Sequence, residues 1–435
     1  MKFAFITPRY GAEIVNGAEH VCRLLAEQAC ERHDIDVLTT CARDPETWKN
    51  DYAEGADRVR GVLVRRFNVG AGREPEALRN LSMRLQTTAH SRADELEWVR
   101  RSGSTSPGLL DYLKRQHRNY DALVFFSYRA GTTIHGLPVA PDRSVLFPCA
   151  QMEPALRFGI AREALDAPAA VGYMSGAERR IVRAHSWRVP RVEEIVGVGV
   201  DAAPEARYPR LQQEESTVPD VDVASDQPAA DSEAEEPPAH LSARGVLFRR
   251  RHRLPARFAF YGGRIDSGNG TEELLEYFDS FAALNGDGMG ADAHGTRAAL
   301  VVMGVKMMKM PAEPWLTLAG VLHERDRMAA LEAADVALAP DPDDIGAEHV
   351  LQGFAVGTPV VASARNLAAV EHCRKSNGGL YYANREEFVE AMRVVMSNPR
   401  VRERLGGNGR RYVQQNYRWE AVLARFERLV GKVKR

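Results

Sequence analysis

The chain lacks a clear excess of either charge. Its 435 residues include 58 Lys and Arg and 59 Asp and Glu, which leaves a formal net charge of −1. A dedicated nucleic-acid-binding protein usually carries a basic excess, so nucleic acid is excluded as the expected partner. The apolar fraction of 44% and the charged fraction of 27% are typical of a soluble globular protein.

The sequence is also poor in cysteine pairs, metal motifs and long hydrophobic runs. Its five cysteines are scattered and none forms a CxxC pair, so neither a disulfide framework nor a structural zinc site is expected. The twelve histidines show no HExxH spacing, which favours a metal-independent site without a cofactor. No apolar run reaches the ~18 residues of a membrane helix, and the N-terminal run is too short for a signal peptide. We therefore expect a cytoplasmic protein.

Short apolar runs alternate with helical patterns along most of the chain. The predicted strands of the first half are 2–7, 35–40, 62–67, 122–126, 145–147 and 195–198, and those of the second half are 258–261, 300–303, 316–318, 336–339 and 359–362. The predicted helices include 18–32, 271–284, 386–397 and 400–430. Strands separated by helices form parallel sheets. The sequence therefore predicts an α/β protein with two doubly wound, Rossmann-like domains and a ligand cleft at the carboxyl ends of their strands.

An acidic segment separates the two halves. Residues 212–236 contain nine acidic residues and no Lys or Arg, and such a segment cannot bury enough apolar surface to offset its ordering entropy. We expect an N-terminal domain at 1–200, a disordered linker at 205–245, a second domain at 246–410, and a terminal helix at 411–435 that packs back across the domain junction. Outside 212–236 the chain carries 58 basic and 50 acidic residues, a net charge of +8. This basic body favours anionic partners, including peripheral contact with an anionic membrane at its inner face.

A glycine-rich segment follows the predicted strand 258–261. It contains Gly262, Gly263 and Arg264, then Gly268 and Gly270, and leads into a predicted helix. Such a turn presents free backbone N–H groups and the positive end of the helix dipole. An arginine guanidinium adds a two-pronged donor for phosphate. The pattern indicates a diphosphate site, and the alternative is a tight structural turn with Arg264 in a salt bridge.

Several motifs in order resemble the family 4 (group 1) glycosyltransferases of GT-B fold. Residues 263–275 are similar to their GR-x4-KG-x3-L motif, and 339–361 to their P-x3-E-x7-E-A-x-A-x-G-x-P-V-V motif. Residues 16–19 resemble their GGAE turn, and 411–419 their R-Y-V-x3-Y-x-W ending. The resemblance implies a retaining transferase, in which the C-terminal domain holds a nucleoside-diphosphate sugar and the N-terminal domain a hydroxyl-bearing glycan or lipid-linked acceptor, as in the synthesis of cell-envelope glycans.

The chain departs from the family where the resemblance implies donor contacts. Asn269 stands in place of a phosphate-binding Lys, and Lys306, after the strand 300–303, is a candidate to supply that charge. The first family glutamate, near the reacting carbon, falls on Asp344. The second, which holds the ribose hydroxyls, falls on Gln352, whose amide binds more weakly than a carboxylate.

The N-terminal half shows a similar departure after the strand 145–147. Gln151 stands where close relatives have a His, and Glu153 remains as a candidate base, or only as a cap of the helix before Pro154. Asn16 and Gly17 are expected in the acceptor-side loop. The candidate catalytic residues are Asp344, Glu153 and Gln151. The candidate donor-binding residues are Gly263, Arg264, Asn269, Gly270, Lys306 and Gln352.

Three functions are compatible with these motifs. The leading hypothesis is a hexosyltransferase of the family 4 type that uses a nucleotide sugar and no metal. The second is a catalytically silent homologue that binds a glycan or a partner protein, because several polar site positions are substituted. The third is a nucleotide-sugar epimerase on the same fold.

Overall fold

The computed structural model describes residues 1–15, 17–201, 243–286, 298–323 and 326–433. The predicted acidic linker therefore lies almost entirely outside the described residues, as does Asn16. Two compact units are formed. Unit 1 contains Met1–Gly199, Asp343–Glu348 and the segment that starts at Asn416, and unit 2 contains the described residues between Val200 and Pro342 and those of His349–Gln415.

Unit 1 is built on an eight-stranded sheet, counted over the described residues, in the order β3-β4-β2-β1-β5-β6-β7-β8. The strands are β1 Lys2–Ile6, β2 Asp34–Thr40, β3 Gly55–Val59, β4 Val62–Phe67, β5 Ala122–Phe126, β6 Ser144–Phe147, β7 Ala170–Tyr173 and β8 Val192–Ile195. All neighbours are parallel except the β3–β4 pair. The order reverses between β1 and β5, so the loops that follow these two strands lie at a topological switch point.

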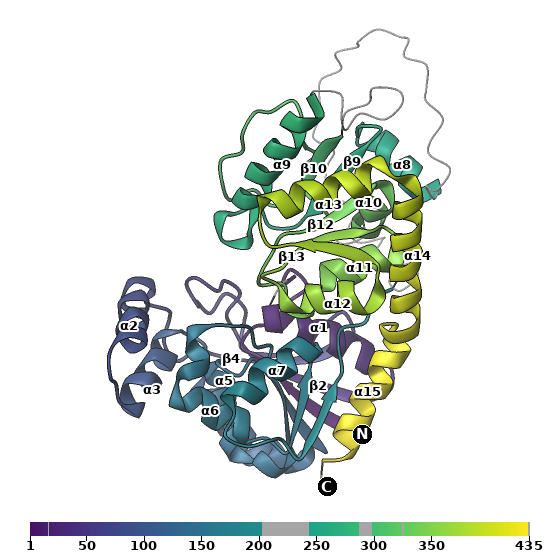
Figure 1. Ribbon diagram of the computed structural model, residues 1–435. Coiled ribbons are helices and arrows are strands. Elements are labelled where there is room, and N and C mark those ends of the chain that lie inside the picture. The colour runs from purple at the N-terminus through teal and green to yellow at the C-terminus, as the bar shows by residue number, and fades with distance from the viewer. Residues whose placement is uncertain (16, 202–242, 287–297, 324–325, 434–435) are drawn as a thin grey trace. The chain divides into compact units, whose positions relative to one another are not determined.

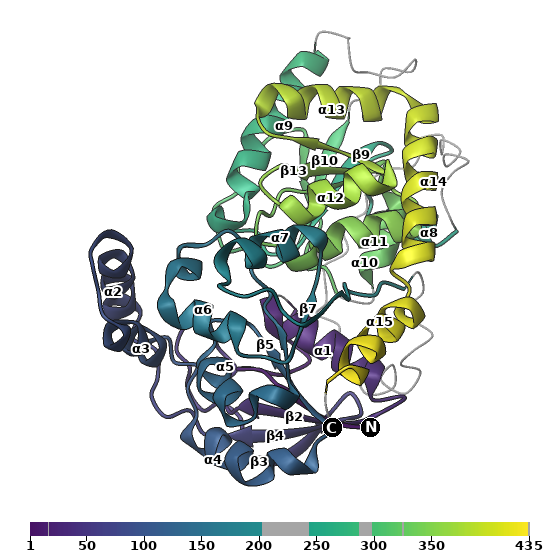
Figure 2. The same cartoon turned by 60° about the horizontal axis from the view of Figure 1, so that its bottom comes forward.

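The helices of unit 1 cover both faces of this sheet. They are α1 Gly17–Ala29, α2 Pro75–Thr87, α3 Arg92–Arg101, α4 Pro107–Gln116, α5 Gly131–Gly136, α6 Gly159–Asp166, α7 Gly176–His185 and α15 Trp419–Gly431. Successive strand residues point to opposite faces. Phe3 and Phe5 of β1 pack with Phe426 of α15, whereas Ala4 packs with Leu113 of α4. Figures 1 and 2 both show α2 and α3 side by side at the edge of this unit.

Unit 2 has a parallel six-stranded sheet, again counted over the described residues, in the order β11-β10-β9-β12-β13-β14. The strands are β9 Phe258–Gly262, β10 Ala299–Met303, β11 Leu316–Leu318, β12 Val336–Ala339, β13 Val360–Ser363 and β14 Gly379–Tyr382. The helices are α8 Ala243–Arg251, α9 Thr271–Gly286, α10 Arg327–Ala333, α11 Glu348–Val356, α12 Leu367–Ser376, α13 Arg385–Ser397 and α14 Pro399–Asn416. The order reverses between β9 and β12, which makes their loops the switch point of this unit. The prediction of two doubly wound parallel-sheet domains is confirmed.

Some of the predicted elements differ from the structure. The strand expected at 195–198 is β8, Val192–Ile195. It ends early because Val196 and Gly197 both donate their N–H groups to the Tyr173 carbonyl, and Gly197 has a φ of 75°. The strand β14 lies outside the predicted strands and pairs with β13. The helix expected at 400–430 is two helices, because the backbone of Arg418 is extended.

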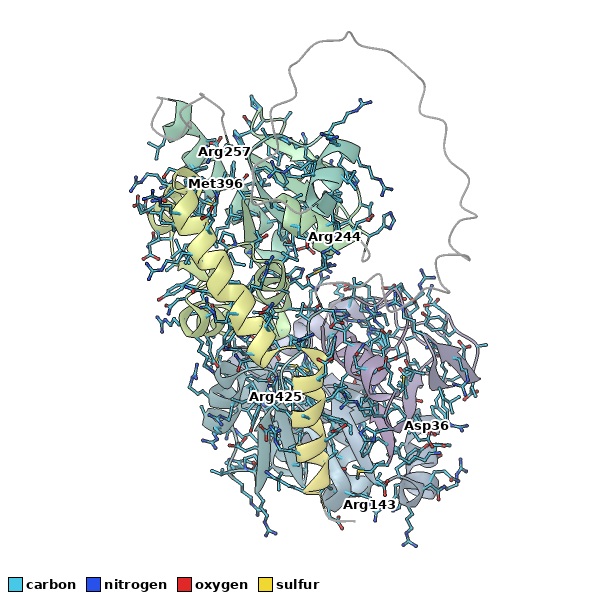
Figure 3. The ribbon with its side chains drawn as sticks, turned by 90° about the vertical axis from the view of Figure 1, so that its right-hand side faces the viewer. Asp36, Arg143, Arg244, Arg257, Met396 and Arg425 are labelled. Atoms are coloured by element: carbon cyan, nitrogen blue, oxygen red, sulfur yellow. The ribbon has the colours of Figure 1, made fainter. Side chains whose placement is uncertain are left out.

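The last helix, α15, belongs to unit 1 although the chain enters it from unit 2. Trp419 is buried, and a Cβ at Gly199 would lie 2.3 Å from its ring. Arg425, labelled on α15 in Figure 3, donates through Nε to the Val196 carbonyl at 2.9 Å. In unit 2, the labelled pair Arg257 and Met396 is similarly joined, since the guanidinium of Arg257 donates to the Met396 carbonyl. The first contact holds α15 against the residue after β8, and the second holds the residue before β9 against α13.

Candidate functional site

The glycine-rich loop after β9 is organised around Asp266. One carboxylate oxygen of Asp266 accepts hydrogen bonds from the backbone N–H groups of Gly268 at 2.9 Å and Asn269 at 3.1 Å. The other oxygen lies 2.5 Å from Nε of Arg264, whose side chain is 56% exposed. The guanidinium and the amides that sequence analysis assigned to a diphosphate are thus turned toward an internal carboxylate. Any anionic ligand at this loop meets the negative charge of Asp266.

Asn269 is buried in a hydrogen-bond network of its own. Its side-chain NH₂ donates to the Tyr261 hydroxyl at 2.9 Å and to the Arg264 carbonyl, and its side-chain oxygen accepts from the Thr271 hydroxyl at 2.6 Å. The network joins the end of β9 to the start of α9. Buried polar groups are normally satisfied in this way, so the contacts of this side chain are structural.

The loop after β10 runs beside the glycine-rich loop. The N–H of Ile265 donates to the Val305 carbonyl at 2.9 Å, and Ile265 forms a parallel bridge with Lys306. The side chains of Lys306 and Arg264 are both exposed on these adjacent loops. Gly304 makes the close approach possible, because its φ is 157° and a Cβ there would lie 1.6 Å from the Gly263 carbonyl oxygen. The structure therefore brings the two predicted phosphate-binding cations to one edge of the sheet.

Gly270 brings the loops after β9 and β12 together at the switch point of unit 2. Its φ is 81°, and a Cβ there would lie 2.6 Å from the carbonyl oxygen of Pro340. Gln352 of α11 lies behind these loops and lines a cavity of about 10 Å³ together with Arg327 and His349. That volume holds about one water molecule.

Unit 2 contains a larger cavity, of about 260 Å³, at the opposite edge of the sheet. It lies at the amino ends of β12 and β13 and is lined in part by Asp335 and Arg402. The Asp335 carboxylate accepts from the N–H of Phe258 at 3.0 Å, and Arg402 donates to the Val395 carbonyl at 2.9 Å. Asp335 and Arg402 therefore stabilise the edge of the sheet where the strands begin. The larger cavity lies at this edge, so it is remote from Arg264 and Lys306, which follow the carboxyl ends of the strands.

In unit 1, Glu153 is held by two residues that follow β5. The Tyr128 hydroxyl donates to one oxygen of Glu153 at 2.8 Å, and the Arg129 guanidinium donates to the other. Glu153 makes no side-chain hydrogen bond to the start of the short helix that follows it, so the capping alternative is wrong. Burial raises the pKa of Tyr128, and the Glu153 carboxylate raises it further. Tyr128 and Arg129 were not predicted as site residues. Their position just after a buried strand at a switch point could have indicated them.

The backbone around Glu153 has two strained positions. Ser127, after β5, has a φ of 69°, and Cys149, after β6, has a φ of 50°. Left-handed backbone is unfavourable for residues other than glycine and concentrates at functional sites. Gln151 lies between Cys149 and Glu153 on the same loop and is partly exposed. The structure therefore places both predicted catalytic residues of the N-terminal half on one strained loop.

A buried carboxylate holds this loop from below. Glu178 of α7 accepts hydrogen bonds from the backbone N–H groups of Ala150 at 2.9 Å and Met174 at 2.5 Å. Burial raises the pKa of Glu178 to about 7, while hydrogen bonds from the Met174, Ala150 and Cys149 amides act in the opposite direction. The loops after β6 and β7 are thus joined to one side chain. Glu178 was not identified from the sequence, because its partner Ala150 lies 28 positions before it and Met174 lies across a turn.

The loop between β1 and α1 supplies a further charged pair. Glu19 lies 3.0 Å from the Arg9 guanidinium, and Arg9 also donates to the Arg43 carbonyl at 3.1 Å. Gly17 has a φ of 75°, which the turn into α1 requires. The described part of the acceptor-side loop is therefore held by Arg9.

Asp344 lies in the Asp343–Glu348 segment, which belongs to unit 1. One oxygen of its carboxylate accepts from the N–H of Glu348 at 3.2 Å, at the start of α11. Within unit 1, Glu348 lies 2.9 Å from Nε2 of His20, and a Cβ at Gly346 would lie 3.2 Å from the Met174 side chain. The segment that carries Asp344 thus packs beside α1 and the loop after β7. Asp344 itself stabilises a helix start.

The described residues contain no cluster of three or more His, Cys, Asp or Glu side chains arranged to hold a metal ion. Within the same residues, no helix is long and apolar enough to cross a membrane.

No protein-family model matches the chain. The Xenopus tropicalis protein "Glycosyltransferase 1 domain-containing protein 1" is 28% identical over 83 residues, which are 19% of this chain and 23% of that protein. The match therefore spans under a quarter of the relative's length. A sucrose-phosphate synthase from Thermosynechococcus elongatus has a similar structure, with a TM-score of 0.64, 15% identity, and coverage of 99% of this chain and 98% of that one.

Two further solved structures resemble the chain over its whole length. Anabaena Alr3699/HepE, solved in complex with UDP and glucose, gives a TM-score of 0.63 at 12% identity and covers 99% of this chain and 100% of its own. WaaG, a glycosyltransferase involved in lipopolysaccharide biosynthesis, gives 0.54 at 13% identity, with coverage of 99% and 100%. At such low identity these likenesses show the fold alone, and the chain has the GT-B glycosyltransferase fold.

Proposed function

We propose that the chain is a glycosyltransferase that binds a nucleoside-diphosphate sugar through unit 2 and a hydroxyl-bearing acceptor through unit 1. The main observation that supports this proposal is the switch point of unit 2, where the glycine-rich loop after β9 meets the loop after β12. Ligands of doubly wound sheets bind at such points. The exposed cations Arg264 and Lys306 on adjacent loops support an anionic ligand there, and Alr3699/HepE, with the same fold, was solved with UDP.

The proposed reaction is transfer with retention of configuration and without a metal ion. The bond between the anomeric carbon and the diphosphate oxygen breaks, and the acceptor oxygen forms the new bond to that carbon. Arg264 and Lys306 stabilise the charge on the departing diphosphate. The acceptor hydroxyl loses its proton to Glu153 or to the departing diphosphate, while Asp344 orients the transferred hexose.

A direct test measures binding of UDP-, GDP- and ADP-sugars to the full chain by calorimetry. We expect one donor to bind, and Arg264→Ala to weaken it roughly ten- to hundredfold, as for loss of a charged hydrogen bond to phosphate. Arg393→Ala is the matched control, because Arg393 of α13 is 52% exposed and also paired with a carboxylate. Absence of binding with all three donors contradicts the proposal.

A second candidate is a catalytically silent homologue that binds a glycan or a partner protein. The observation that favours it is the Asp266 carboxylate, which already occupies the amides of the glycine-rich loop. A silent homologue releases neither free sugar nor nucleoside diphosphate from any donor, even over long incubation. Slow donor hydrolysis that Glu153→Gln or Arg264→Ala abolishes excludes this candidate.

A further inference from the structure

The loop between α7 and β8 exposes two large apolar side chains. Trp187 is 65% exposed and Val189 is 70% exposed. The other four tryptophans of the chain are buried or partly buried, so Trp187 is the most exposed of the five. The two side chains are two positions apart on one short loop, so they form a small apolar surface together.

The backbone of this loop is fixed, so the exposure is built in. The Asp166 carboxylate accepts hydrogen bonds from the backbone N–H groups of Trp187 and Arg188, both at 3.2 Å. The Ser186 hydroxyl donates to the Val182 carbonyl at 2.8 Å, which ties the loop to the last turn of α7. The Arg162 guanidinium lies 5.7 Å from the Trp187 ring. These contacts hold the two apolar side chains outward.

The surroundings of the loop are strongly basic. Residues 179–191 contain five arginines and no Asp or Glu. Arg179 and Arg183 lie within ion-pair distance of Glu193. Arg188 and Arg191 are exposed, and neither has an ion-pair partner among the residues that the structure describes. The apolar pair is therefore flanked by two exposed arginines, and the Asp166 carboxylate lies against the loop backbone.

The loop leaves the carboxyl edge of unit 1 uncovered. It connects the end of α7 to the start of β8, so it lies at the amino ends of the parallel strands. Glu153 and Gln151 follow β6 at the carboxyl ends. A partner bound at the loop and a ligand bound near Glu153 thus occupy different edges of the same sheet.

We propose that this loop docks unit 1 on an anionic lipid bilayer. Trp187 and Val189 enter the interface between head groups and acyl chains, where tryptophan is favoured. Arg188 and Arg191 bind the lipid phosphates, since basic side chains at a membrane surface gain affinity from anionic lipids. Two apolar side chains are too few for a stable protein interface, which buries ~800 Å² on each partner.

The test uses the full chain, phosphatidylcholine vesicles with or without phosphatidylglycerol, and lipids brominated on their acyl chains. Because Trp187 is the exposed tryptophan, we expect its emission to shift to shorter wavelength and to be quenched by brominated lipid only in the anionic vesicles. Trp187→Phe removes that signal. Arg188→Glu/Arg191→Glu lowers the vesicle partition coefficient at least about twenty-five-fold, because two positive charges are lost at roughly fivefold each.

Arg404→Glu/Arg411→Glu is the matched control, because it makes the same charge change on exposed positions of α14. Equal loss of vesicle binding in both double variants overturns the proposal, since the attraction is then general and not local. Absence of bromine quenching also overturns it. So does a concentration-dependent dimer that Trp187→Ala dissociates in sedimentation velocity, because a second copy then covers the loop. Unchanged thermal unfolding in both double variants ensures that the comparison concerns folded protein.

Discussion

Replacing Asp266 with Asn should increase the affinity of unit 2 for a nucleoside diphosphate. The Asn side-chain oxygen still accepts the hydrogen bonds of Gly268 and Asn269, so the loop keeps its shape, while Arg264 loses its ion-pair partner. A half-exposed ion pair of this kind contributes under about 1 kcal/mol, so its loss costs little stability. A phosphate at ~5 Å from the Asp266 carboxylate is repelled by about 1–2 kcal/mol per charge at an effective dielectric constant of 40–80. The expected gain in UDP affinity is therefore roughly tenfold.

Calorimetric titration of UDP at low and high salt measures this gain. The increase should shrink at high salt, because exposed charges are screened. Glu390→Gln is the control, since Glu390 of α13 is also a carboxylate paired with an arginine but is exposed and lies on another element. An Asp266→Asn variant with equal or weaker affinity would show that the carboxylate does not compete with the ligand. The reasoning from the loop contacts would then be refuted, even if the wild-type chain binds UDP.

Two further variants test the packing beneath the candidate sites. Gly304→Ala should destabilise unit 2 by more than about 3 kcal/mol, because the new Cβ meets the Gly263 carbonyl. Gly320→Ala should cost only about 1–2 kcal/mol, since its Cβ meets no atom. Urea unfolding compares the two variants, and similar losses of stability would contradict this expectation. Arg23→Met should destabilise unit 1 by up to about 3 kcal/mol, because it breaks a buried pair with Glu27, whose carboxylate still lies 3.7 Å from Arg60. Adding Glu27→Leu should recover much of that loss in the same assay, and no recovery would show that the pair itself is not responsible.

The strands that position the sites were predictable because parallel strands buried on both faces appear as short apolar runs. β4, β5, β11 and β12 have the predicted bounds, and β1, β2, β9 and β10 differ by a residue or so. The helices between 75 and 116 were missed because their sequences are rich in charge. Their start signals were nevertheless present, with Pro75 in the first turn of α2, a Ser91–Asp94 capping box in α3, and Ser106 before Pro107 in α4.

The site was less predictable than the fold because side-chain partners come from different strands. Arg264 and Lys306 were identified from their places after strands, and both lie exposed on adjacent loops. Asp266 was overlooked, although it stands two residues from Arg264, because a motif shows residue types and not which of them pair. Tyr128 lies 25 positions before its partner Glu153, and only the pairing of β5 with β6 brings them together.

The two loops that carry the candidate chemistry are therefore held in opposite ways. In unit 1, the loop with Glu153 is held by Tyr128, which follows β5, and by Glu178 of α7. Neither residue belongs to the loop itself, so the surrounding structure maintains the strained backbone at Cys149. In unit 2, the amides of the glycine-rich loop are held by Asp266, a residue of the loop itself. A ligand can displace a local carboxylate without unfolding the sheet, whereas displacing Glu178 exposes buried amides. We therefore expect ligand-dependent changes in hydrogen exchange at residues 264–270 and little change at residues 148–153 on addition of UDP.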